Sequence, residues 1–441
     1  MFFGGTGISD TKKKVFKNIA WAITGKIVAL AGALIAGIIV ARFLGKEQYG
    51  IMNYVISIIA IFQVFADFGL DSIQIREESK AIEQRDTIIG TVFCLRLFFA
   101  IVAFLAIILL VFLFEDDSVI RGYIVLYAFS MILNTTWVAR NHFTSIVWNE
   151  YVVKTEISRS IIGIILKLCF VMLNLPLIYF ICLLLFDSVL LASGYLLSYS
   201  RKIGPIRAWR FSSELAVYLI KQSFPLLLSG IAIIIYNRID QVMIGKMVDQ
   251  GSLGIYSVAV RFIEMLVFIP TILSQTVSPI LVDIRQKDYA RYQRTSRTFM
   301  NVTVFTCVLL AIATSLLAYP LVYFTFGETY IEAAAILSIL SFKVIGDALS
   351  QTSGQLIIIE GIQKYAPVRN IMGGVACVIL NLFFITRYGI TGAAYVAVFT
   401  ILISGTLTNG LIPAYRNIFR MQMKALLVGW RDVGNIKSLA R

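Results

Sequence analysis

The sequence predicts an all-α, polytopic membrane protein with twelve transmembrane helices, arranged as two six-helix lobes around a central cavity. Three observations lead to this prediction. Hydrophobic residues make up 59% of the 441-residue chain and charged residues only 15%, against roughly a quarter in soluble proteins. The mean hydropathy is +0.84. The apolar residues also form segments of about 20 residues, which is the length that crosses the hydrocarbon of a bilayer.

Polar and mostly basic loops separate the apolar segments and give the order of the expected helices. The expected spans cover residues 18–42, 48–70, 88–113, 119–139, 160–176, 177–199, 223–248, 253–282, 298–325, 333–359, 365–386 and 389–413. These spans predict an N-terminal lobe, a cytoplasmic linker, a C-terminal lobe and a basic cytoplasmic tail, over 1–200, 201–222, 223–413 and 414–441. Most Lys and Arg residues of the loops fall on the side that holds both termini, which places both termini in the cytoplasm.

Two pairs of similar segments predict that the lobes are repeats of one unit. YGIMNYVIS (49–57) is similar to LGIYSVAVR (253–261), and CFVMLNL (169–175) is similar to CVILNL (377–382). The two pairs have nearly the same separation along the chain. Because a unit of six spans returns to its starting side, the copies are expected to be parallel repeats, with a binding site between them.

Several functional classes lack their residues in this chain. The net charge of +14 is explained by the basic loops and does not require a nucleic-acid partner. All the cysteines lie in apolar runs without a Cys-x-x-Cys motif, and His142 is the single histidine, which argues against disulfides and metal sites. The sequence contains no nucleotide-binding loop or catalytic triad pattern, so we expect a protein that is not an enzyme and has no cofactor.

The segment 224–248 is apolar enough to cross a bilayer, yet it contains Asn237, Arg238 and Asp240. A charge near the centre of a membrane costs about 2.5–3.5 kcal/mol on insertion scales. The polar side of this helix is therefore expected to face water, another helix or a substrate. Residues that are two apart lie on different faces of a helix, so Arg238 and Asp240 cannot simply neutralise each other.

Three cations of the first lobe lie at a similar depth in spans that run in the same direction. Lys26, Arg96 and Lys167 are each about 10–12 Å from the expected cytoplasmic boundary, at about 1.5 Å per residue. They could form one anion-binding shelf. The alternative is that each side chain extends to the head groups of the bilayer, and the sequence leaves both interpretations open.

The second lobe contains pairs of opposite charge at helical spacing. Arg261 and Glu264 are three residues apart, Lys343 and Asp347 are four apart, and Asp187 at the end of the first lobe has no obvious local partner. The pairs could be purely structural. The alternative is that buried carboxylates bind a coupling proton or sodium ion, because burial disfavours their charged form. The candidates for ion coupling are Asp240, Asp187, Glu264 and Asp347.

Five segments carry a resemblance to a known family. They are ARFLGKEQYGIMNYVISI (41–58), DFGLDSIQIREESK (67–80), YNRIDQVMIGKM (236–247), LGIYSVAVRFIE (253–264) and GQLIIIEGIQKYAPVRNIMGG (354–374). The chain resembles the bacterial polysaccharide flippases, the O-antigen and capsule transporters of the multidrug/oligosaccharidyl-lipid/polysaccharide exporter superfamily. The resemblance extends over nearly the whole chain.

The resemblance implies transport of undecaprenyl-diphosphate-linked oligosaccharides from the cytoplasmic to the periplasmic leaflet by alternating access, with coupling to an ion gradient. It implies that basic residues of the cavity bind the diphosphate and the glycan, with Arg238 first, followed by Arg261 and Lys343. Lys26, Arg96 and Lys167 are candidates for substrate binding on the depth argument alone. A monomer in the bacterial inner membrane is expected, with the polysaccharide polymerase and the chain-length machinery as partners.

Two alternatives remain open at this point. A related exporter of drugs or of teichoic-acid precursors would have a similar sequence. A membrane polysaccharide polymerase or lipid-linked glycosyltransferase is a different class, which would need a sizeable external loop with positioned acids and bases. The expected external loops are only a few residues long, which favours a transporter.

Overall fold

The computed structural model describes residues 8–429, and for residues 8–31, 33, 82 and 428 it describes the backbone alone. The described residues form helices without any β-strand. The N-terminal half consists of α1 (Ile8–Asp67), α2 (Leu70–Lys80), α3 (Arg85–Phe114), α4 (Ser118–Leu133), α5 (Trp137–Ser145), α6 (Asn149–Met172) and α7 (Leu177–Lys202). The expected all-α fold class is confirmed.

The C-terminal half begins with the longest uninterrupted apolar helices. It consists of α8 (Ser213–Met247), α9 (Gln250–Lys287), α10 (Tyr289–Leu316), α11 (Ala318–Phe326), α12 (Ala333–Leu340), α13 (Lys343–Ile359), α14 (Ala366–Leu402), a π-helix (Ile403–Leu407), α15 (Thr408–Leu411) and α16 (Arg416–Val428). Short 3₁₀ turns link several of these helices, at Ile82–Gln84, Asn134–Thr136, Ile206–Ala208, Glu328–Tyr330, Gln363–Tyr365 and Pro413–Tyr415.

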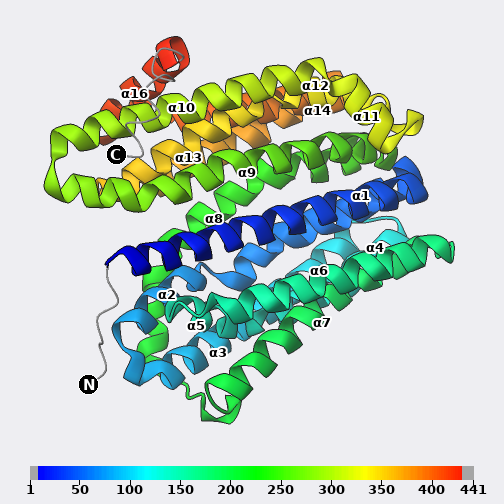
Figure 1. Cartoon of the computed structure of the whole chain (residues 1–441). Helices are drawn as coiled ribbons and strands as arrows, with labels where there is room; N and C mark the ends of the chain where they lie inside the picture. The colour runs from blue at the N-terminus through cyan, green and yellow to red at the C-terminus, as the bar shows by residue number, and fades with distance from the viewer. Residues whose placement is uncertain (1–7, 430–441) are drawn as a thin grey trace.

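Two of the helices are broken by a glycine. Gly45 in α1 has φ 70° and Gly389 in α14 has φ 56°, a region that only glycine adopts without strain. Figure 1 shows the blue ribbon of α1 crossing the molecule and returning towards α2. Each of these helices therefore contains two of the expected spans, 18–42 with 48–70 and 365–386 with most of 389–413.

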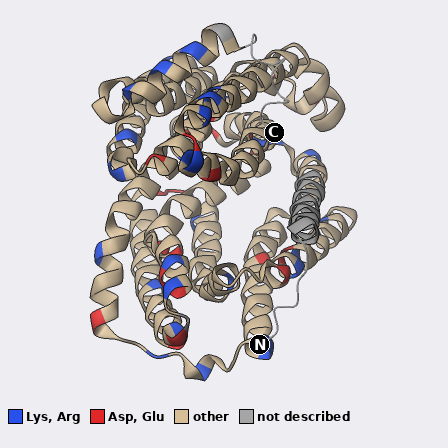
Figure 2. Cartoon of the chain, turned by 60° about the vertical axis from the view of Figure 1, so that its left-hand side comes forward, with Lys and Arg blue, Asp and Glu red and all other residues tan. Residues whose placement is uncertain are grey.

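The outer faces of the helices are apolar. Within residues 8–429, nine helical stretches are long and apolar enough to cross a membrane. Large side chains on these stretches are exposed, among them Phe98, Leu109 and Leu316. Long stretches of ribbon without charge in Figure 2 agree with this pattern. Exposed apolar surface of this extent is typical of contact with lipid, so the chain is a multi-pass membrane protein; the number of twelve spans stays a prediction.

The helices gather into two lobes that correspond to the two halves of the chain (Figure 1). The first lobe is built from helices that pack against one another, which are α3, α4, α6 and α7. The second lobe is built in the same way from α9, α10, α12, α13 and α14. The contacts between the lobes are made mainly by α1, which lies against α8 and α9. The groups that face this boundary are therefore the ones that a substrate between the lobes would meet.

The lobes come into close backbone contact at two glycines that occupy equivalent positions in the predicted repeat. A Cβ atom on Gly50 would lie 1.7 Å from the carbonyl oxygen of Gln250, and one on Gly254 would lie 2.0 Å from that of Lys46. Each glycine thus lies against the carbonyl group of the residue four positions before the other glycine. We call this reciprocal contact the glycine clamp. It joins the returning arm of α1 to the first turns of α9.

The start of α9 is fixed beside this clamp by Asp249. Its carboxylate accepts hydrogen bonds from the backbone N–H and the hydroxyl of Ser252, at 2.8 and 2.7 Å. Burial acts to raise the pKa of Asp249, but these hydrogen bonds outweigh burial and hold the pKa below its usual value. An N-terminal cap of this kind contributes about 1 kcal/mol to helix stability.

Candidate functional site

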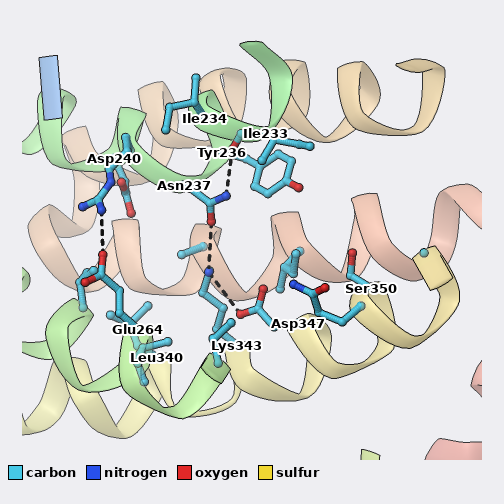
Figure 3. Close-up of a pocket in the computed structure, with 18 of the residues that line it drawn as sticks. Ile233, Ile234, Tyr236, Asn237, Asp240, Glu264, Leu340, Lys343, Asp347 and Ser350 are labelled. Atoms are coloured by element: carbon cyan, nitrogen blue, oxygen red, sulfur yellow. Dashed lines mark hydrogen bonds and ion pairs between the residues drawn. The ribbon is translucent and has the colours of Figure 1, made fainter. Parts of the chain in front are cut away.

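A polar cavity of about 590 Å³ lies inside the C-terminal half. Its walls come from α8, α9, α12, α13 and α14. Polar residues of these largely apolar helices face the cavity (Figure 3). The cavity holds three cationic and three anionic side chains, which are Arg238, Lys343, Arg369, Asp240, Glu264 and Asp347. This site lies within one half of the chain, whereas the sequence predicted a site between the halves.

Arg238 and Asp240 turn to different partners, as their spacing along α8 predicted. The guanidinium of Arg238 donates to Glu264 Oε1 at 2.8 Å. Asp240 accepts from the hydroxyl of Tyr256 at 2.5 Å and from the backbone N–H of Gln241 at 2.8 Å. Asp240 therefore has neutral donors and, among the described residues, no cation within 4 Å.

The two pairs predicted from helical spacing are formed. Lys343 lies 3.3 Å from Asp347 and also donates to Asn237 Oδ1 at 3.4 Å (Figure 3). Arg261 lies 3.5 Å from Glu264. Because Glu264 also binds Arg238, two guanidinium groups share this carboxylate.

The N-terminal half adds charges beside this wall. Asp187 on α7 does have a partner, because Arg159 on α6 lies 3.3 Å from it. The charge of Lys167 is close enough to be influenced by Asp187, by Arg159 and, across the boundary, by Arg261. We call Arg159, Lys167, Asp187, Arg238, Arg261 and Glu264 together the interlobe face, which has four cations and two anions.

The expected shelf of three cations requires a correction. Arg96 is fully buried and binds the carboxylates of Asp67 and Asp71 on the neighbouring segments, with Nη1 2.5 Å from Asp71. Asp71 also accepts from Asn141 at 2.8 Å. Arg96 is thus part of a structural ion-pair network in the N-terminal half, away from the cavity. The side chain of Lys26 lies outside the described residues.

Sequence reasoning missed two basic residues that the structure places in or near the site. Arg159 was expected in a cytoplasmic segment, but the long helix α6 continues from there into the lobe. Arg369 lies only four residues inside the expected span 365–386 and was not among the candidates. It is 9% exposed, and its Nε and Nη1 atoms are buried without a hydrogen-bond partner.

Metal ligation has little support in the donor set. No group of three or more His, Cys, Asp or Glu residues that could hold a metal ion occurs between residues 8 and 429. The sole histidine is buried at 2.7 Å from Glu78, with Nδ1 facing the carboxylate. The polar groups of the site are instead suited to hydrogen bonding and to charge pairing with a ligand.

Comparison with solved structures identifies the class of fold. The lipid II flippase MurJ in an inward closed conformation matches with a TM-score of 0.68 at 14% identity, over 92% of this chain and 91% of that one. An inward-facing multidrug resistance MATE family transporter of the MOP superfamily also gives 0.68 at 14% identity, over 90% and 96%. An outward-facing MATE family transporter gives 0.57 at 14%, over 90% and 93%. The chain therefore shares the fold of these solved structures.

A family model described as polysaccharide biosynthesis protein matches residues 15–285, which is more than half of the chain. The chain belongs to this family. No protein with a curated description matches it. The family and the fold agree with the predicted membrane transporter and not with an enzyme.

Proposed function

We propose that this protein flips undecaprenyl-diphosphate-linked oligosaccharides from the cytoplasmic to the periplasmic leaflet of a bacterial inner membrane. The observation that carries this proposal is the excess of cations on the interlobe face, where four basic residues meet two acidic ones. The family match supports a role in polysaccharide biosynthesis. Both termini are placed in the cytoplasm by the distribution of basic loops.

Arg238 and Arg261 are the residues that we assign to the diphosphate. Guanidinium groups bind phosphate oxygens in a bidentate manner, which fixes orientation as well as charge. The two arginines converge on Glu264, so a diphosphate can add to a group in which the guanidinium groups are already held close together. Glu264 is 40% exposed, so the wall is accessible from the space beside it. Lys167 and Lys343 extend the positive field on either side.

The pairing of the carboxylates favours an anionic substrate over a cationic drug. A site for a cationic drug would hold an accessible acid free for it, but Glu264 and Asp347 are both bound to basic residues and Asp240 is buried against Tyr256. Of the basic residues that line the cavity, Arg369 is the one for which the described part of the chain supplies no acidic partner. A lipid-linked teichoic-acid precursor is also anionic, and it remains the alternative that the charges do not exclude.

Alternating access would open and close the glycine clamp. In this structure the clamp joins the lobes at the end that we place outside, which supports an inward-facing state. The higher similarity to the inward-facing than to the outward-facing transporter agrees with this assignment. Release of the head group on the outer side then requires Gly50 and Gly254 to separate.

We assign ion coupling to Asp240, because it is the acidic residue of the cavity without a cation at salt-bridge distance. Nearby, beside Cys377, Asn381 Oδ1 is buried without a hydrogen-bond partner. Oxygen ligands of this kind suit a hard cation such as sodium. Asp187, Glu264 and Asp347 have basic partners, and we place them second.

The experiment that tests the function is transport by the purified full chain in proteoliposomes. An undecaprenyl-diphosphate oligosaccharide is placed in one leaflet, and the fraction whose sugars become accessible to an added lectin is followed in time. We expect sugars to cross faster than in vesicles without protein, and the same lipid without the diphosphate to cross at the background rate. Equal rates with and without the protein would refute the proposal.

A further inference from the structure

Arg369 has an environment that is unusual for an arginine. It lies on α14, is 9% exposed, and contributes to the wall of the 590 Å³ cavity. Its Nε and Nη1 atoms have no hydrogen-bond partner, and the groups that act on its charge are the phenols of Tyr236 and Tyr415. Removing a cation from water without a counter-charge is strongly unfavourable. The arrangement therefore indicates a ligand that supplies a negative charge.

The carboxylates of the cavity cannot fill this role, because each already has a donor. Asp240 binds Tyr256, Glu264 binds Arg238, and Asp347 lies 3.3 Å from Lys343. Rotating Asp347 towards Arg369 would leave Lys343 without its acidic partner. The formal charges of the cavity sum to zero, but none of its carboxylates forms an ion pair with Arg369, so a local counter-charge for Arg369 would come from outside the chain.

The wall beside Arg369 is suited to a sugar. Along α13 the cavity is lined by Ser350, Gln351 and Gln355, and Tyr236 faces them from α8 (Figure 3). Amide and hydroxyl groups both donate and accept hydrogen bonds, as sugar hydroxyls require. A volume of 590 Å³ is in the range of roughly 300–1,000 Å³ that is typical of small-molecule sites.

The position of Arg369 separates it from the residues assigned to the diphosphate. The cavity follows α13 from Lys343 to Ile358, which is about 22 Å at 1.5 Å per residue. Lys343 begins α13, whereas Arg369 lies near Tyr415, whose hydroxyl donates to the carbonyl of Ile362 just past the other end of α13. A single diphosphate would not reach both ends. The anion at Arg369 is therefore a different group of the cargo.

We propose that Arg369 binds the carboxylate of an acidic sugar, so that the C-terminal cavity selects oligosaccharides that contain a uronic acid. This inference rests on the proposed function, because it names a feature of the same cargo. The planar guanidinium can hold a carboxylate through two parallel hydrogen bonds. Ser350, Gln351 and Gln355 would then orient the hydroxyls of the sugar ring.

The first test compares two lipid-linked oligosaccharides that differ in one sugar, glucuronate in one and its carboxyl-reduced form, glucose, in the other. We expect the wild-type protein to transport the acidic cargo at least about tenfold faster. Arg369→Gln should slow the acidic cargo by about that factor and leave the neutral one within about twofold. Arg387→Gln, at an exposed arginine of the same helix, is the matched control and should change neither rate.

A second measurement separates this inference from the proposed function. If the wild-type protein transports neither cargo, the proposed function is refuted, while binding can still be measured. We expect sodium glucuronate to raise the thermal midpoint of the purified full chain, glucose and inorganic phosphate to have no such effect, and Arg369→Gln to abolish the shift. Arg369→Lys keeps the charge and should retain part of it.

Three results would overturn the inference. One is a wild-type protein that transports the two cargoes at the same rate. Another is Arg369→Gln slowing both cargoes equally, which would indicate a structural role. The third is an Arg369-dependent thermal shift of the same size with inorganic phosphate, which would indicate a general anion site without selection for a sugar.

Discussion

The glycine clamp gives the sharpest prediction about the transport cycle. In Gly50→Ala the new Cβ atom would lie 1.7 Å from the carbonyl oxygen of Gln250, whereas such contacts below 3.0 Å essentially never occur. The two backbones would have to separate by more than about 1 Å, and overpacking of this kind costs about 1–3 kcal/mol. The cost applies only to the state in which the clamp is closed.

The substitution should therefore shift the balance between the two states and leave the fold intact. A difference of about 1–3 kcal/mol corresponds to roughly 5–150-fold in the ratio of closed to open protein. We expect Gly254→Ala to have a similar effect, since its Cβ would lie 2.0 Å from Lys46 O. The double variant should add little, because both substitutions break the same contact.

The assay is a distance measurement between spin labels at Asp116 and Thr329, which are exposed residues of opposite lobes at this end of the molecule. The distribution should move to longer distances in Gly50→Ala. Gly122→Ala is the matched control, because a Cβ on Gly122 meets nothing within 4 Å. A distribution for Gly50→Ala that is the same as that of the wild-type protein would refute the reasoning.

The remaining predictions concern single charged residues. Arg238→Ala should abolish transport in proteoliposomes with normal membrane insertion, and Arg238→Lys should restore only part of it, because lysine lacks the fork geometry; wild-type activity in Arg238→Ala would remove this residue from the site. Arg96→Met should lower the thermal midpoint markedly, because loss of one partner of a buried ion pair costs about 3–5 kcal/mol; an unchanged midpoint would contradict the structural role. Asp240→Asn should make the transport rate independent of a sodium or proton gradient, and a rate that still follows the gradient would exclude Asp240 as the coupling residue.

The fold class could be predicted from the sequence because hydrophobicity reports directly on the surrounding solvent. The break at Gly45 lies between two expected spans, and the break at Gly389 lies at the first residue of an expected span, where short polar loops interrupt the apolar runs. The pairs of Arg261 with Glu264 and of Lys343 with Asp347 could be predicted as well, because helical spacing fixes which side chains of one helix are neighbours.

Contacts between helices could not be predicted in this way. Arg96 seemed free because Asp67 and Asp71 lie about 25 residues or more before it, on other segments. Arg238 pairs with Glu264 and not with Asp240, which is closer to it in the sequence, and this pairing likewise depends on how α8 packs against α9. Arg369 was missed because position along one helix says nothing about the helices that cover it.

The confinement of the large polar cavity to one half has a mechanical consequence. Rocking of the lobes would carry the contents of this cavity along with the helices that enclose it, without any exchange of ligands across the boundary. The first half, whose Arg96 is tied to Asp67 and Asp71, would then serve as a stiff partner against which the loaded half swings.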